Sequence, residues 1–233
     1  VDASITGGLL SGGLHAVTGP DHIAAVLPPS MGHSWFYGMR IGAAWGLGHG
    51  VSATALGLAA IALKGQMSAR FTVLQKLSSL ADSMVGFSLL FIGALGMKEA
   101  RTMNTELVSR DSGAGTVSSR SGRTGSSGSG INFGVDNLAI FGNGLLHGFS
   151  LDGAPSIAPA LAMSSVRSAL WFLAAYCIGT MVTMAITAGA VGESSKRLVQ
   201  KSNNPKLPKR LCLGSSIFAL LAGTYWILRS LFL

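Results

Sequence analysis

Long runs of apolar residues, separated by shorter polar connections, dominate the pattern along this chain. A helix needs roughly 20 residues to cross the hydrocarbon layer of a membrane, and several runs reach that length. We predict six spans, near residues 3–27, 37–63, 77–98, 138–163, 166–192 and 211–232. The pattern therefore predicts an all-α membrane protein with six transmembrane helices.

The first run is interrupted by Gly19-Pro20. Proline lacks the N–H that continues a helix, and its ring clashes with the carbonyl group four positions earlier, here that of Ala16. We therefore predict that the first transmembrane helix is broken at residues 18–20.

The segment between the third and fourth runs has a different composition, because residues 102–134 consist largely of Ser and Gly with scattered Arg. Such a segment cannot bury enough apolar surface to fold by itself. We predict a disordered linker there, which divides the chain into units at residues 1–101 and 135–233.

The two units resemble each other in sequence. Residues 14–18 align with 146–150, and residues 44–51 align with 175–182 without a gap. Each unit has an odd number of predicted spans, so the second copy must cross the membrane in the opposite sense. The pattern predicts two inverted three-helix repeats, as in many secondary transporters, whose sites lie on interrupted helices near the midplane.

Composition agrees with a membrane protein, since 48% of the 233 residues are hydrophobic and 11% are charged. A soluble domain would carry about 25% charged residues. The formal charge of +8 does not indicate nucleic-acid binding, because Lys and Arg lie mainly between the runs without interleaved aromatic residues. No phosphate-binding loop, nucleophile elbow, HExxH or dinucleotide fingerprint occurs, so we expect neither enzymatic activity nor a permanent cofactor.

The first apolar run contains His15, Asp21 and His22. Ionisable groups at membrane depth are costly, which makes these residues functional candidates. Two imidazoles and a carboxylate suit a divalent transition metal better than magnesium or calcium, and a broken helix allows them to converge. In the alternative interpretation, Gly19-Pro20-Asp21 is a helix start, Asp21 offsets unpaired N–H groups and the histidines are core residues.

Further candidates occur in the second and fourth runs. His49 lies between glycines, and it either completes the site or bonds to a facing backbone carbonyl. His147 and Asp152 form a weaker copy of the first motif, as ligands or as a relay, although Asp152 also has the alternatives of pairing with an Arg or capping a helix break. We expect Asn143 and Thr180 to bond between helices. The candidate metal ligands are His15, Asp21, His22, His49, His147 and Asp152.

Residues 15–26, 45–50 and 144–148 together resemble the histidine motifs of the nickel/cobalt transporter superfamily. Five residues separate His15 from Asp21. This spacing resembles the shorter six-span, urease-accessory-like branch, which has plant and algal plastid members. The long permeases have one residue fewer between the corresponding His and Asp.

The resemblance implies a secondary permease for Ni²⁺ or Co²⁺, or for a related ion such as Mn²⁺ or Fe²⁺. It places His15, Asp21 and His22 in the signature that serves metal selection, and His49 and His147 in the second and third histidine motifs. Alternatives are a non-transporting membrane subunit that docks in a larger complex, and a transporter of protons or small organic cations. The lipid bilayer and the metal ion are the expected partners, together with complex subunits or further copies of the chain.

The composition and the resemblance fit a bacterial inner membrane or a plastid membrane. The chain begins at Val1 rather than Met, an observation that favours the plastid.

Overall fold

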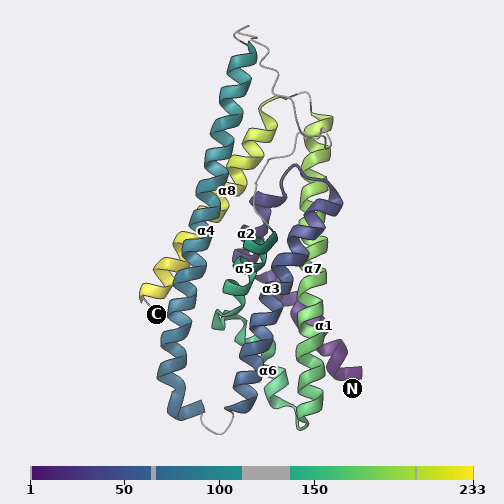
Figure 1. Ribbon diagram of the computed structural model, residues 1–233, viewed down its shortest axis with the longest axis vertical. Coiled ribbons are helices and arrows are strands. Elements are labelled where there is room, and N and C mark those ends of the chain that lie inside the picture. Colours follow the sequence, from purple (N-terminus) through teal and green to yellow (C-terminus); the bar gives the residue numbers. More distant parts are fainter. Residues whose placement is uncertain (1, 64–66, 112–136, 203, 233) are drawn as a thin grey trace.

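The computed structural model describes residues 2–63, 67–111, 137–202 and 204–232, which form helices joined by short connections (Figure 1). In chain order the elements are α1 (Asp2–Thr18), α2 (Pro20–Ser30), α3 (Trp35–Ala62), α4 (Met67–Asp111), α5 (Asn137–Gly148), the 3₁₀ helix η1 (Leu151–Gly153), α6 (Ala154–Ala162), α7 (Val166–Lys201) and α8 (Leu207–Phe232). No β-strand occurs among the residues described. The all-α prediction is confirmed for this part of the chain.

Four helices in the described ranges are long and apolar enough to cross a membrane: α3, the Ser79–Thr102 part of α4, α7 and α8. They coincide with the second, third, fifth and sixth predicted spans. The run over residues 3–27 is divided between α1 and α2, in agreement with the predicted break, whereas the prediction of a single helix over residues 138–163 is wrong, because that run is divided between α5, η1 and α6. The expectation of six transmembrane helices is thus confirmed for four.

The first run breaks where the sequence predicted. α1 ends at Thr18 and α2 begins at Pro20, while Gly19 between them has an extended backbone with φ −76° and ψ 112°. Pro20 occupies the first helical position, where its missing N–H costs least.

The run over residues 138–163 is also broken, although the prediction placed a break in the first helix alone. α5 ends at Gly148, η1 follows, and α6 begins at Ala154. Pro155 has no N–H with which to continue a helix from the preceding turn, so a new helix starts beside it. Both halves of the chain therefore contain an interrupted segment.

The α4 helix continues to Asp111, beyond the predicted start of the linker at Thr102. That predicted boundary is therefore wrong. The remaining residues of the predicted linker, 112–134, lie outside the described residues.

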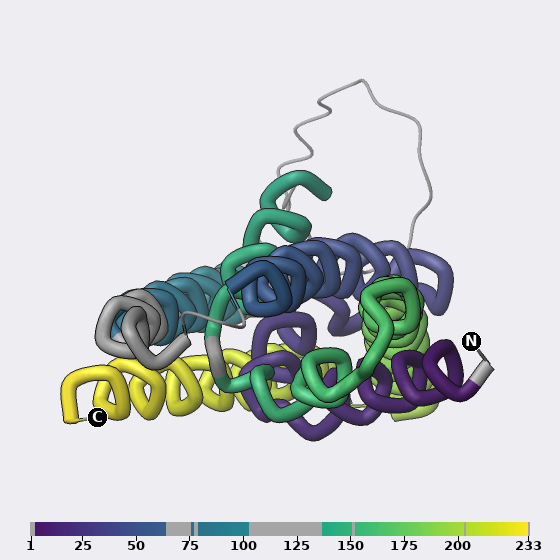
Figure 2. Tube along the Cα trace, turned by 90° about the horizontal axis from the view of Figure 1, so that it is seen from below, coloured from purple at the N-terminus to yellow at the C-terminus, as the bar shows by residue number. Residues whose placement is uncertain are grey.

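The helices form two packed groups around the short ones. α3 packs along α7, α1 packs on α7, α5 packs on α3, and α4 pairs with α8. Figure 1 shows α2, α5 and α6 between the long helices, and Figure 2 shows α4 beside α8 at one end of the molecule. The interrupted segments thus lie inside the bundle.

Glycine allows α5 to approach α3 at backbone distance. A Cβ atom at Gly144 would fall against the carbonyl oxygen of Trp45, and one at Gly48 would fall against the carbonyl oxygen of Phe141. Contacts of this kind are typical of membrane helices, whose interfaces are rich in small residues.

The pairing of α1 with α7 repeats this arrangement. A Cβ atom at Gly12 would fall against the carbonyl oxygen of Tyr176, and one at Gly179 against the carbonyl oxygen of Leu9. The sequence alignment of the two units, extended by two residues, pairs Gly12 with Gly144, and it pairs Gly179 with Gly48. The two interfaces are therefore equivalent.

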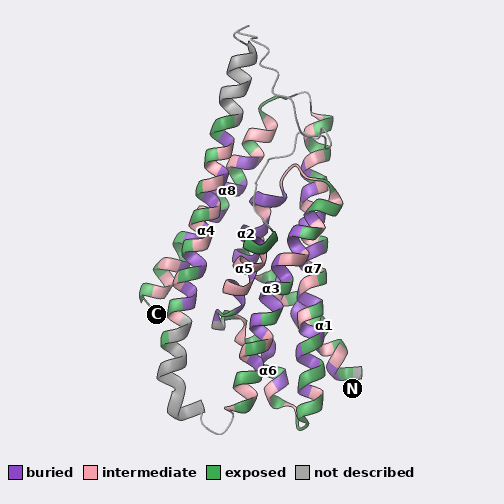
Figure 3. Cartoon of the chain, viewed as in Figure 1, coloured by how far each residue is buried: buried purple, intermediate pink, exposed green. Residues whose placement is uncertain are grey.

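Large apolar side chains are exposed on the outer faces of the helices, while a group of polar side chains is buried within the apolar core. Large exposed side chains include Phe36, Phe87, Phe91 and Leu221, which are 77%, 62%, 66% and 65% exposed. Figure 3 shows the exposed residues along the outward faces of the long helices and the buried ones between them. Exposed apolar faces suit a lipid bilayer, and the polar groups gathered in the centre are the place to look for function.

A candidate metal centre formed by buried histidines

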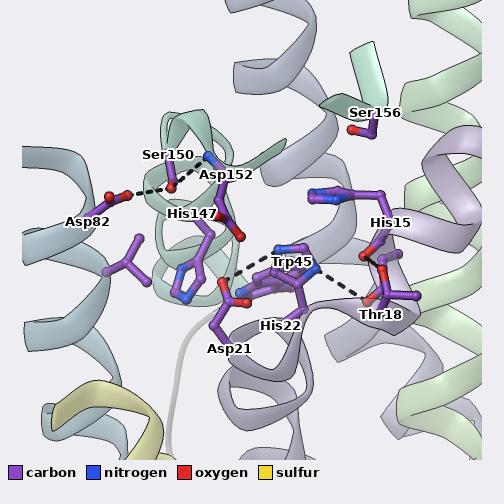
Figure 4. Close-up of polar contacts among 12 residues, drawn as sticks. His15, Thr18, Asp21, His22, Trp45, Asp82, His147, Ser150, Asp152 and Ser156 are labelled. Atoms are coloured by element: carbon purple, nitrogen blue, oxygen red, sulfur yellow. Dashed lines mark hydrogen bonds and ion pairs between the residues drawn. The ribbon is translucent and has the colours of Figure 1, made fainter. Parts of the chain in front are cut away.

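Three histidines from three helices meet in the centre of the bundle: His15, His22 and His49, called here the histidine cluster. One ring nitrogen from each lies within 4.8 Å of those of the other two. His22 and His49 are buried and His15 is half-buried. Figure 4 shows His22 beside Trp45 and the imidazole of His15 on the neighbouring helix.

The break in the first run brings His15 and His22 together. On a continuous helix these residues would lie about 10 Å apart along the axis. In the structure their ring centroids are 4.8 Å apart. The expected convergence of the two imidazoles is observed, and it depends on the extended backbone at Gly19.

Pro20 also leaves the Ala16 carbonyl oxygen free to accept a hydrogen bond from His22. An ordinary residue at position 20 would donate its N–H to the carbonyl oxygen of Ala16, and proline leaves that oxygen free. His22 Nδ1 lies 3.3 Å from the Ala16 oxygen. Because a carbonyl oxygen only accepts, Nδ1 is the donor in this contact, and Nε2 faces the other way, towards Asp21. A ring held in this way is typical of metal-binding histidine.

We expect Pro20→Ala to weaken metal binding by roughly 10- to 100-fold while leaving every candidate ligand present. The new N–H at position 20 competes with His22 for the Ala16 oxygen, so the imidazole loses its fixed orientation. Calorimetric titration with Ni²⁺ measures the effect. Pro29→Ala, in α2 but away from the cluster, is the control, and equal affinities of the parent and the Pro20 variant would contradict this role.

Several buried ring nitrogens near the cluster have no hydrogen-bond partner among the described residues. They are His15 Nε2, both ring nitrogens of His49, and Nε2 of His147. Buried polar atoms are nearly always paired, so unpaired ones call for an explanation such as a bound ion. His49 makes no bond to a facing carbonyl in this part of the structure, contrary to the simpler interpretation of that residue.

Asp21 and His147 lie beside the cluster. Asp21 Oδ2 is 3.5 Å from His22 Nε2, and Figure 4 shows the carboxylate between the rings of His22 and His147. His147 Nδ1 donates to the Asn143 carbonyl oxygen at 2.9 Å, and its ring centroid is 6.4 Å from that of His22. Asp21 also lies in the first turn of α2, in agreement with the helix-start interpretation, and its role as a ligand stays a prediction.

Trp45 forms the wall that joins these rings. Its ring stacks on His49 at 5.3 Å between centroids and meets His147 edge-on at 5.2 Å. Its Nε1 donates to Asn143 Oδ1 at 2.8 Å, as expected of an amide that bonds between helices. Thr180 likewise donates to the Gly12 carbonyl oxygen at 3.3 Å. Both polar residues therefore hold helices together.

Asp152 is engaged elsewhere. Its Oδ1 accepts from Arg229 Nη1 of α8 at 2.7 Å. Of the alternatives for this residue, pairing with an arginine is the one that the structure contains. We therefore do not count Asp152 among the candidate ligands.

The sequence analysis missed Asp82. This residue of α4 is 8% exposed, and its Oδ1 accepts a hydrogen bond of 2.5 Å from Ser150 Oγ. A signal was present, because Asp82 is the charged residue within the otherwise uncharged residues 79–97. An acidic side chain inside a span is itself a functional indication.

The geometry and the fold define the class of protein: a helical membrane protein with a buried cluster of imidazoles, contributed by an interrupted segment and by the adjacent α3. Such a cluster can replace the water around a divalent transition-metal ion. Imidazole suits Ni²⁺, Zn²⁺, Cu²⁺ and iron, whereas Mg²⁺ and Ca²⁺ prefer oxygen ligands.

Comparison with known proteins finds relatives in a plant. The chain is 30% identical over 224 residues to Chloroplast protein FOR GROWTH AND FERTILITY 1 of Arabidopsis thaliana. It is 30% identical over 225 residues to Chloroplast protein FOR GROWTH AND FERTILITY 2 of the same plant. The alignments cover 93% and 97% of this chain but 56% of each relative, so the chain spans about half the length of the curated relatives it matches. No protein-family model and no solved structure matches the chain.

Proposed function

We propose that this chain is a membrane permease for a divalent transition-metal ion. The observation that carries the proposal is the set of buried ring nitrogens at His15, His49 and His147 without hydrogen-bond partners in the described structure. Buried imidazoles without hydrogen-bond partners are unfavourable unless a ligand binds to their nitrogens for part of the transport cycle.

The ligand set supports an ion of intermediate softness. The histidine cluster offers neutral nitrogen donors, and Asp21 adds a carboxylate beside His22. This combination favours Ni²⁺ or Co²⁺ over ions that bind mainly to oxygen. The same choice follows from the resemblance of the histidine motifs to nickel/cobalt transporters. Mn²⁺ and Fe²⁺ are the next candidates.

The proposed architecture is two inverted three-helix repeats with six crossings. In this arrangement α1 with α2 corresponds to α5 with α6, α3 corresponds to α7, and α4 corresponds to α8. The equivalent contacts of Gly144 with Trp45 and of Gly12 with Tyr176 support the correspondence. The interrupted segments then complete the two crossings that no single helix supplies, and the cluster lies at the interface of the repeats.

Two cavities of unequal size support alternating access to the cluster. One of about 130 Å³ is lined by Ile41 and Trp45 of α3 and by Asn143 of α5. The other, of about 10 Å³, is lined by His49 and Ala53 of α3. Along α3 the two cavities lie on opposite sides of the histidine layer. Unequal cavities on the two sides fit a permease that opens to one side of the membrane at a time.

The proposed location is a plastid membrane. The apolar outer faces of the helices suit a bilayer, and both curated relatives are named as chloroplast proteins. Import of the tagged full-length protein into isolated plastids, followed by membrane fractionation, tests this location.

Metal binding and uptake by the purified chain test the function. We expect Ni²⁺ or Co²⁺ to raise the apparent unfolding temperature in detergent, because a ligand that prefers the folded state stabilises it by mass action. Liposomes that contain the chain should accumulate the same ion, and Mg²⁺ is the control. Binding should weaken on acidification, since protons compete for the nitrogens. No shift with Ni²⁺, Co²⁺, Mn²⁺, Fe²⁺ or Zn²⁺ would contradict the proposal and favour a docking subunit.

A further inference from the structure

Asp82 is a buried acid that the metal centre does not use. Its side chain lies in α4 and is 8% exposed, and its Oδ1 accepts from Ser150 Oγ at 2.5 Å. Ser150 belongs to the break between α5 and α6, where its Oγ also accepts from the Asp152 backbone N–H at 3.3 Å. Asp82 is thus attached to the interrupted segment of the second half, as Figure 4 shows.

The charges around Asp82 do not balance. The charged groups that act on its carboxyl from neighbouring elements are Arg229 of α8, Asp152 of η1 and Asp21 of α2. The guanidinium of Arg229 binds Asp152 directly at 2.7 Å. One described cation therefore faces several carboxylates, and a buried carboxylate without an ion-pair partner of its own is neutralised most simply by a proton.

A small cavity lies between His49 of the histidine cluster and Ser150, the hydrogen-bond partner of Asp82. The cavity of about 10 Å³ has room for about one water molecule, and its lining includes His49 and Ser150. His49 is 2% exposed, and both of its ring nitrogens lack partners in the described structure. A water molecule placed there would connect His49 to the Ser150 hydroxyl, which donates to Asp82.

We propose that Asp82 is a proton-binding site whose protonation is coupled to occupation of the histidine cluster. The proposal rests on the proposed permease function. With a divalent ion at the cluster, Asp82 is ionised, because the two charges attract. When the ion leaves, a proton takes its place in the local charge balance. Coupling of this kind is reciprocal, so each cation lowers the affinity of the chain for the other.

The proton step is balanced without a further reactant. A water in the small cavity passes a proton to Ser150 Oγ while Ser150 passes its own hydroxyl proton to Asp82 Oδ1. The water regains a proton from the aqueous phase, which loses one H⁺ for each proton bound at Asp82. The net change is one new O–H bond at Asp82, and release follows the same route in reverse.

Infrared spectroscopy of the full chain in nanodiscs tests the site itself. On acidification we expect a carboxylic-acid C=O band that is missing in Asp82→Asn and retained in Glu99→Gln. The control removes an acid from the same helix away from Ser150. We expect Ni²⁺ to shift the titration of this band to lower pH. A parent without the Asp82 band at any pH at which it stays folded would overturn the proposal.

Liposome transport tests the coupling. For the parent and Glu99→Gln, the limiting Ni²⁺ ratio across the membrane should change about tenfold per unit of pH gradient for each proton exchanged. For Asp82→Asn, Ni²⁺ should still raise the unfolding temperature, but the accumulation of Ni²⁺ should not depend on the pH gradient.

The outcomes separate the two proposals. If the parent binds no metal, the permease proposal is refuted. The proposed coupling of Asp82 to the metal is then refuted as well, even if the infrared band of Asp82 titrates. A parent that transports Ni²⁺ while Asp82→Asn keeps the full pH response refutes the proton site alone. Dependence of transport on Na⁺ at constant pH would also refute it, because the coupled ion would then be sodium.

Discussion

Replacing His22 by alanine is expected to lower the affinity of the chain for Ni²⁺ on the order of 100-fold or more. Loss of a residue that merely orients a ligand costs roughly 10- to 100-fold, and loss of the ligand itself costs at least as much. His22 lies between the other members of the cluster, with ring centroids 4.8 Å from His15 and 4.7 Å from His49. Its removal leaves the remaining imidazoles without a shared centre.

Thermal unfolding with and without Ni²⁺ measures this loss. At a metal concentration of 100 times the parent dissociation constant, binding stabilises the parent by about 2.7 kcal/mol, and a 100-fold weaker variant by about 0.4 kcal/mol. Most of the metal-dependent shift should therefore disappear. Uptake of Ni²⁺ into liposomes should fall in parallel.

His33→Ala is the matched control for His22→Ala. His33 stacks on Tyr37 with 4.1 Å between ring centroids, in the connection between α2 and α3, and it is not part of the cluster. Its variant should keep the parent shift. If His22→Ala bound and transported Ni²⁺ as the parent does, the cluster would not be the metal site.

Replacing Gly144 by alanine is expected to destabilise the fold by roughly 1–3 kcal/mol. The new methyl group would fall against the carbonyl oxygen of Trp45, which is backbone and cannot rotate away. α5 would have to move from α3, and His147 and Trp45 would move with these helices. Apparent unfolding temperature in detergent is the measurement.

Gly142→Ala in the same helix provides the comparison. A Cβ atom at Gly142 meets no described atom within 4 Å. Alanine favours helix over glycine by about 1 kcal/mol, so this variant should be neutral or more stable. Glycine-to-alanine substitution is thus expected to lower the stability of the fold at position 144 and to keep or raise it at position 142. Equal effects at both positions would contradict the close approach of α5 to α3.

Gly12→Ala extends the comparison to the proposed repeat. Its methyl group would fall against the carbonyl oxygen of Tyr176, the equivalent of the contact at Gly144. The two variants should lower the unfolding temperature by similar amounts. A neutral Gly12→Ala beside a disruptive Gly144→Ala would show that the two interfaces are not equivalent.

Local chemistry explains which features were predictable. Gly19-Pro20 ends a helix whatever surrounds it, so the break in the first run and the approach of His15 to His22 followed from the sequence. The break between α5 and α6 has similar signals in Gly153 and Pro155. The fold prediction nevertheless treated that run as one helix, since its length and hydropathy resemble a continuous span.

Contacts between distant segments explain what was not predictable. Asp152 was a candidate ligand by its position after His147, but its partner Arg229 comes from α8. Asp82 is connected to the centre of the bundle by its hydrogen bond from Ser150, which is 68 positions away in the chain. Neither pairing leaves a local pattern, because the partners are chosen by how the helices pack.

The sequence by itself determined the class of protein, the position of the first helix break and the histidines nearest to it. These depend on composition and on the backbone chemistry of glycine and proline, which act over a few residues. Only the tertiary structure decided that His49 completes the cluster with His15 and His22, and that Asp82 and Arg229 take part in the polar centre. The reason is physical: a side chain's partners across a bundle depend on which helices are adjacent and on how closely they approach.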